Sequence, residues 1–180
     1  MRARNVSAEP TRLLKRRLRS TWARERGLWA LSWGCTVLLG WCFPTFRRWQ
    51  RGMPEENIEQ YGLTDKASVR QGDLFETVPE TFDCIIFNHP FFCGVPPEGD
   101  TVAASMLAPE DLIHRFLEQA PSHLRSGGVI VMPFYTKAGT ANDPAVQGPK
   151  HGFNVTTCFR AMSNSGLQTG EILIHELRRI

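Results

Sequence analysis

Acidic residues, tryptophan and closely spaced cysteines are each missing from large parts of this 180-residue chain. No Asp or Glu lies between Glu25 and Glu55, and no Trp follows Trp49. The cysteines are five in number, and no two of them have the Cys-x-x-Cys spacing. Neither a disulfide framework nor a metal site is therefore indicated, and a reducing, cytoplasmic location fits best.

The uneven charge divides the chain into two segments. Residues 1–52 carry 12 Lys and Arg against 2 acids, a net charge of +10. Residues 53–180 carry 9 basic and 16 acidic groups, a net charge of −7. We therefore predict an atypical basic, Trp- and Arg-rich segment over residues 1–52 and one globular domain over residues 53–180. The sequence indicates no oligomeric state.

The first segment contains an apolar run whose role the sequence leaves open. Residues 27–43 hold no charge for 17 positions, which is the short limit for a membrane-spanning helix. Basic residues flank both sides, and no Ala-x-Ala-like site follows for a signal peptidase. Three interpretations stand: a membrane or export segment, the product of a shifted reading frame in GC-rich DNA, or a basic extension. A basic extension would contact nucleic-acid phosphates or be a solvated tail.

Residues 53–180 contain apolar patterns that alternate between strand and helix. This alternation predicts an α/β sheet domain. The helices are expected at residues 53–62 and 109–124. The strands are expected at residues 67–71, 83–87, 129–132, 154–161 and 170–177, with the last two forming a hairpin.

Four stretches stand out in this segment, at residues 57–63, 71–75, 88–91 and 124–130, with the sequences NIEQYGL, QGDLF, NHPF and LRSGGVI. In their order and spacing they resemble class I S-adenosylmethionine-dependent methyltransferases. The resemblance covers about residues 55–180 and is to the Asn-Pro-Pro-Phe/Tyr type, which includes release-factor glutamine and small-domain methyltransferases. It implies a Rossmann-like sheet, here incomplete at its first strands. It also implies methyl transfer from S-adenosylmethionine to a nitrogen of a protein glutamine, a nucleobase or a small amine.

The resemblance assigns the substrate site to the turn Asn88-His89-Pro90-Phe91, which follows the strand expected at residues 83–87. The carboxyl edge of such a sheet is where ligands bind. The Asn88 side-chain oxygen and the His89 backbone carbonyl can each accept one N–H of a target amine or amide, which orients its nitrogen. Pro90 restricts the turn, and the Phe91 ring can stack on a planar group. The alternative is an ordinary exit from a strand with a packed Phe.

Cofactor binding is assigned by the same resemblance to Asp73, Leu74 and Asn88, with Asp73 meeting the adenine amino group. His89 departs from the family, which usually has Pro at this position. The backbone carbonyl survives this change, and the sequence leaves open whether the imidazole has a chemical role of its own.

A second departure concerns the Gly-rich turn of the Asp-x-Gly-x-Gly kind, which such enzymes place after their first strand. The chain has no such motif and no acid for the cofactor ribose in the region that precedes residue 55. We therefore predict that the chain binds S-adenosylmethionine poorly. The rival hypothesis is a degenerate domain that serves as a binding module without activity.

Overall fold

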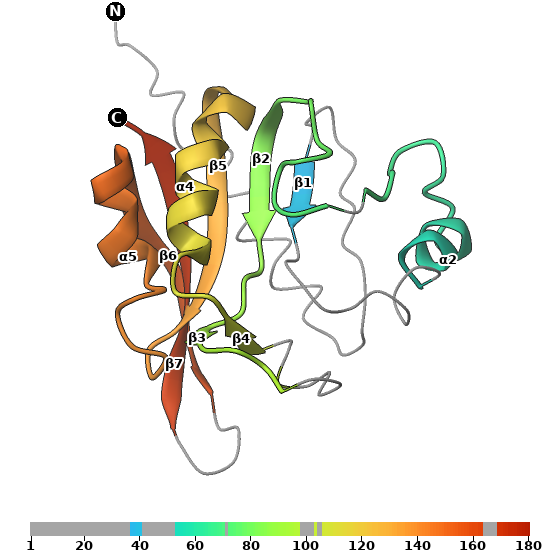
Figure 1. Cartoon of the computed structure of the whole chain (residues 1–180). Helices are drawn as coiled ribbons and strands as arrows, with labels where there is room; N and C mark the ends of the chain where they lie inside the picture. Colours follow the sequence, from blue (N-terminus) through green and yellow to red (C-terminus); the bar gives the residue numbers. More distant parts are fainter. Residues whose placement is uncertain (1–36, 41–52, 71, 98–102, 104–105, 164–168) are drawn as a thin grey trace, which may run out of the picture.

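The computed structural model describes residues 37–40, 53–70, 72–97, 103, 106–163 and 169–180 (Figure 1). Its main sheet has five strands in the order β1-β2-β5-β7-β6. Strands β1, β2 and β5 run parallel, whereas β7 is antiparallel to both of its neighbours. The five strands are β1 (Val37–Gly40), β2 (Phe82–Phe87), β5 (Leu124–Tyr135), β6 (Phe153–Ser163) and β7 (Gly170–Arg179).

Helices and a small second sheet complete the described fold. Helix α4 (Leu112–His123) lies across the main sheet, and α2 (Met53–Gln60) lies beyond β1 (Figure 1). Short α5 (Pro144–Gln147) and the 3-10 helix η2 (Gly148–His151) follow β5. Strands β3 (Phe92–Cys93) and β4 (Leu107–Ala108) form a parallel pair. These elements confirm the predicted α/β class.

Parallel pairing aligns the carboxyl ends of the first two strands. Gly40 at the end of β1 pairs with Phe87 at the end of β2. Strand β5 pairs with β2 up to Val131 and then continues to Tyr135. The residues that follow β2 therefore emerge beside the last four residues of β5.

The core lies between α4 and the sheet. The buried side chains of α4 are those expected from the helical periodicity, with His114, Glu118 and Gln119 exposed on the other side. The Phe116 ring stacks on Phe87 with ring centres 4.0 Å apart, and Phe75 stacks on Phe116 at 5.5 Å. This stack fixes the end of β2 against the helix. The buried residues of α4 are Leu112, Ile113, Phe116, Leu117 and Ala120.

One predicted strand is wrong. Residues 67–70 form no strand, and Gln71 lies outside the described residues. A strand requires hydrogen-bonding partners, and the described part of the sheet has no strand beyond β1 with which this segment pairs. Residues 67–70 instead lie beside α2, where three of the four are exposed.

The apolar run of residues 27–43 is described only at Val37–Gly40, and these four residues form β1. The remaining residues of the run lie outside the described part of the chain. The three interpretations of this run concern those residues and stay predictions. No described helix is long and apolar enough to cross a membrane. The strand occupies the position beside β2 where the resemblance expects a first strand.

Candidate active site at the carboxyl edge of the sheet

The turn after β2 presents one polar side chain outward and holds the next two residues inward. Asn88 is exposed, whereas His89 and Pro90 are buried and Phe91 is half-buried. This alternation leaves the Asn88 amide accessible at the carboxyl edge of the sheet. A group in solution can therefore form hydrogen bonds with it.

His89 lies inside the protein, with only 3% of the whole residue exposed. Its Nδ1 atom lies 2.8 Å from the Pro90 carbonyl oxygen. Because a carbonyl only accepts, Nδ1 carries the proton in this bond. Burial lowers the pKa of His89 to about 4, against the opposing effect of the Pro90 and Pro133 carbonyls. The ring is therefore neutral at neutral pH.

Aromatic side chains connect the turn to the end of β5. The Phe91 ring meets the edge of His89 at a centroid distance of 5.7 Å, and its other neighbour is Tyr135 at 6.4 Å. Tyr135 also contacts Phe92 at 6.1 Å. The sequence pattern ended the strand before Tyr135, but the structure makes this buried residue the last of β5.

Gly170 is a site residue that the sequence reasoning missed. It begins β7, and a Cβ atom built on it would lie 2.4 Å from Cε2 of Tyr135. Only glycine leaves room for the tyrosine ring here. The pairing of Tyr135 with Ile172 across the two strands produces this contact, and no local sequence signal reveals it.

Asp73 lies in a turn that is fastened to α4. Its Oδ2 atom lies 2.5 Å from Nη1 of Arg115, with 52% of the aspartate side chain exposed. Leu74, next to it, has a φ of 49°, which is a left-handed conformation that costs a non-glycine residue about 1–2 kcal/mol. Because Arg115 precedes Phe116, which stacks on Phe87, one helix anchors both the Asp73 turn and the end of β2.

These residues fit only part of an S-adenosylmethionine site. Asn88 and the half-exposed Asp73 have the oxygen acceptors that the resemblance assigns to them. The Asp73 carboxylate, however, is already paired with Arg115, and the sequence has no Gly-rich turn for the methionine part of the cofactor. Among the described residues, no group of three or more His, Cys, Asp or Glu is arranged to hold a metal ion.

A polar cluster around the buried His175 lies within electrostatic reach of His89. His175 on β7 contacts Thr157 at 3.2 Å through Nδ1 and lies 4.0 Å from Asp143 through Nε2. Asp143 also accepts a hydrogen bond from the Ala145 backbone N–H at the start of α5. Burial lowers the pKa of His175 despite the nearby Asp143 carboxylate. When it is protonated, His175 also lowers the pKa of His89, a smaller effect than burial, so the two rings lie close enough to interact electrostatically.

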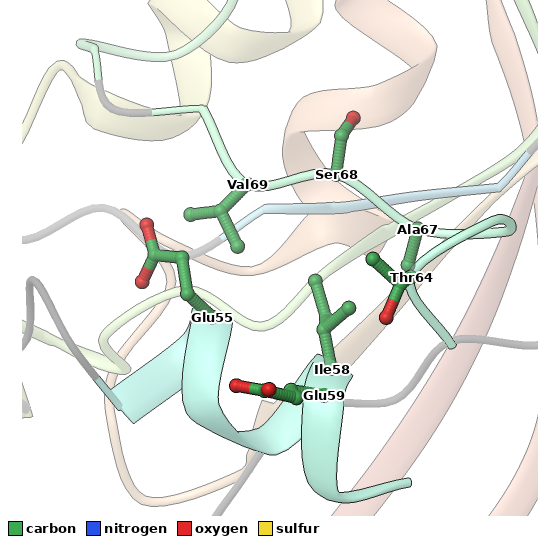
Figure 2. A pocket seen from close by; sticks show the side chains of 7 residues that line it. All are labelled: Glu55, Ile58, Glu59, Thr64, Ala67, Ser68 and Val69. Atoms are coloured by element: carbon green, nitrogen blue, oxygen red, sulfur yellow. The ribbon is translucent and has the colours of Figure 1, made fainter. Parts of the chain in front are cut away.

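A hollow of about 330 Å³ lies elsewhere, between α2 and residues 64–69 (Figure 2). Figure 2 shows the carboxylates of Glu55 and Glu59 on its helix side, with Val69 on the opposite wall. None of the predicted site residues lines it, so this hollow is not the predicted site. Its lining residues are Glu55, Ile58, Glu59, Thr64, Ala67, Ser68 and Val69.

The α/β sheet and the Asn-x-Pro-Phe turn at its carboxyl edge define a class I methyltransferase fold. The family model described as methyltransferase small domain matches residues 52–142. The chain belongs to this family.

Comparisons with individual proteins agree with the family. The chain is 36% identical over 86 residues to a ribosomal protein uL3 glutamine methyltransferase from Bordetella pertussis, in a match that covers 42% of this chain and 29% of that protein. The chain thus spans less than a third of this relative.

Solved structures with a similar fold include a ribosomal protein L11 methylase from Lactobacillus delbrueckii subsp. bulgaricus, at 16% identity and a TM-score of 0.43. That comparison covers 69% of this chain and 50% of the other. TrmN from Thermus thermophilus is similar at 18% identity and a TM-score of 0.42, covering 72% of this chain and 33% of the other.

Proposed function

We propose that this domain transfers a methyl group from S-adenosylmethionine to a nitrogen atom, and that the turn after β2 binds the acceptor. The observation that carries the proposal is the exposed Asn88 amide at the carboxyl edge of the sheet, followed by the buried His89 and Pro90. Membership in the methyltransferase small domain family supports it.

The contribution of the turn is to bind and orient the target nitrogen. A primary amide or amine carries two N–H groups on one nitrogen. The Asn88 side-chain oxygen can accept one of them, and the His89 backbone carbonyl can accept the other. Phe91 offers an aromatic face beside them for a planar group. A nitrogen held at two points has a defined orientation, and orientation can account for a large part of a rate enhancement.

We propose a protein glutamine amide as the first acceptor to test, because a relative is named as a ribosomal protein uL3 glutamine methyltransferase. The net charge of −7 over residues 53–180 disfavours a phosphate-rich substrate. A nucleobase amino group would then need the basic residues 1–52 for phosphate contacts, and a small amine is the third acceptor class.

The test is methyl transfer from radiolabelled S-adenosylmethionine to purified ribosomal protein uL3 by the full chain. Because the Gly-rich turn is missing, the cofactor is supplied at about 1 mM, the top of the usual KM range. We expect Asn88→Ala to lower kcat/KM at least about tenfold, since one hydrogen bond and the orientation it gives are lost.

The matched control is Asn154→Ala, since Asn154 is an exposed asparagine on β6. This variant should retain the activity of the unmodified chain. Equal activity of the Asn88→Ala variant and the control would show that the turn does not bind the acceptor.

A degenerate binding module is the second candidate. The Asp73–Arg115 ion pair and the absence of a strand at residues 67–70 favour it, because both affect the cofactor half of the site. Calorimetry separates the two candidates. Weak cofactor binding together with measurable methyl transfer supports the enzyme, whereas a folded chain that neither binds the cofactor nor transfers methyl groups is a binding module.

A further inference from the structure

The His89 side chain occupies a place in the turn that neither the substrate nor the solvent reaches. The residue before it is exposed, but His89 as a whole is 3% exposed. A group in this position does not contact the acceptor directly. Its effect on the site must therefore pass through the residues that it touches.

A hydrogen bond links the imidazole to the backbone of the turn itself. The Nδ1–H group donates to the Pro90 carbonyl oxygen at 2.8 Å, which bridges two consecutive residues of the turn. The other ring nitrogen, Nε2, is buried and forms no hydrogen bond of good geometry with the described residues, although the Pro133 carbonyl lies close enough to raise the pKa of the ring. The ring thus has one hydrogen bond within the turn, and this bond restrains the peptide between Pro90 and Phe91.

Two aromatic side chains pack against the ring. Phe87, the last residue of β2, lies 5.8 Å away by ring centres, and Phe91 meets the imidazole edge-on at 5.7 Å and 86°. Phe87 is itself stacked on Phe116 of α4. The imidazole therefore connects Phe91 to the packed core through Phe87.

We propose that His89 is a positioning residue whose Nδ1–H bond to Pro90 and edge contact with Phe91 hold the acceptor turn in its binding conformation. A proline at this position would restrict the backbone through its ring. Histidine supplies the restraint through its side chain instead. The inference rests on the proposed function, because the turn is taken as the acceptor site.

The donor geometry suggests a pair of variants that differ by one methylene group. In His89→Asn the amide nitrogen can occupy the place of Nδ1 and donate to the Pro90 carbonyl. In His89→Gln the donor lies one bond further out, near the place of Nε2. We expect His89→Asn to keep kcat/KM for uL3 methylation within about threefold and His89→Gln to lose about tenfold, the value of one net hydrogen bond.

The dissociation constant for S-adenosylmethionine should change much less than kcat/KM in both variants, because the His89 ring contacts Pro90 and Phe91, and neither of these is assigned to the cofactor. A general loss of folding would instead lower activity and cofactor binding together. His89→Phe keeps an aromatic ring without a donor and should behave like His89→Gln. Equal activity of the Asn and Gln variants would overturn the proposal.

Nuclear magnetic resonance tests the proposal without activity. A long-range ¹H–¹⁵N correlation spectrum of the full chain should show His89 as the Nδ1–H tautomer, with a proton that exchanges slowly with water. The Phe91 ring signals should shift in His89→Gln and stay in place in His89→Asn. An Nε2–H tautomer would overturn the proposal. If uL3 is not methylated by the unmodified chain but these spectra are observed, the proposed acceptor fails and the positioning role stands.

Discussion

At the scale of single residues, the Asp73 carboxylate has two candidate partners, the adenine of the cofactor and Arg115. The sequence resemblance assigns it to the adenine amino group, and the structure pairs its Oδ2 atom with Arg115. The left-handed Leu74 beside it marks the turn as a conformation that the surrounding structure must stabilise. A salt bridge this exposed contributes at most about 1 kcal/mol to stability. This gain does not exceed the cost of the left-handed Leu74, so stability alone does not account for the conformation of the turn.

Asp73→Asn distinguishes the two roles when it is compared with Asp83→Asn. Asp83 pairs with Arg125 at 2.7 Å, and both partners are about as exposed as Asp73 and Arg115. We expect each variant to lower the free energy of unfolding by no more than about 1 kcal/mol in urea denaturation. Only Asp73→Asn should raise the KM for S-adenosylmethionine, by up to about tenfold, because a charged acceptor is replaced by a neutral one. Equal KM values in the two variants would remove Asp73 from the cofactor site.

At the scale of elements, local periodicity predicted the position and buried face of α4 and the positions of most strands. The apolar face of α4 and the strand before Asn88 follow from side-chain spacing, which is a property of a few neighbouring residues. Residues 67–71 have a strand-like composition, but pairing decides whether a strand forms, and pairing depends on distant segments. The contact of Gly170 with Tyr135 likewise arises from the register between β5 and β7. Local patterns therefore located the turn but not the aromatic residues around it.

Phe116 connects α4 to the end of β2, and its removal should reveal this role. The residue is 2% exposed and stacks on both Phe75 and Phe87. We expect Phe116→Ala to lower the free energy of unfolding by about 3–5 kcal/mol, because truncation leaves a cavity in a packed core.

The control for this variant is Phe159→Ala on β6. Phe159 is 40% exposed, so the same truncation should cost less than about 1 kcal/mol. Urea denaturation of both variants measures the difference. Similar losses in the two would mean that the ring stack does not anchor β2 on α4.

At the scale of the whole molecule, one strand of the main sheet comes from the segment that composition sets apart. Charge and tryptophan content separate residues 1–52 from the rest, yet β1 from that segment pairs with β2 in the sheet. The sequence did not reveal this strand because residues 27–43 are uncharged and mostly apolar, and such a run has no clear period that separates a strand from a helix. The two predicted segments therefore remain a hypothesis about composition, with the family match beginning at residue 52.

The whole molecule should also lose stability in mild acid because its buried histidines are held neutral. Burial lowers the pKa of His89 to about 4, and burial also lowers the pKa of His175 and of His151. In the unfolded chain a histidine has a pKa near 6.5, so between about pH 4 and 6.5 the unfolded state binds more protons than the folded state. The stabilisation is therefore complete above about pH 6.5 and is lost as the pH falls through this window.

For His89 this loss amounts to about 3 kcal/mol at the acid end, at 1.36 kcal/mol for each unit of pKa difference. Urea denaturation between pH 5 and 6.5 measures about half of this loss, and most carboxylates titrate below about pH 4.5 and contribute little in that range. The free energy of unfolding should rise with pH in this range. His89→Phe should reduce the slope of this rise by up to about 1.36 kcal/mol per pH unit, which corresponds to one bound proton. Equal slopes in the two proteins would mean that the imidazole already binds a proton in the folded chain at these pH values, which its burial between Phe87 and Phe91 opposes.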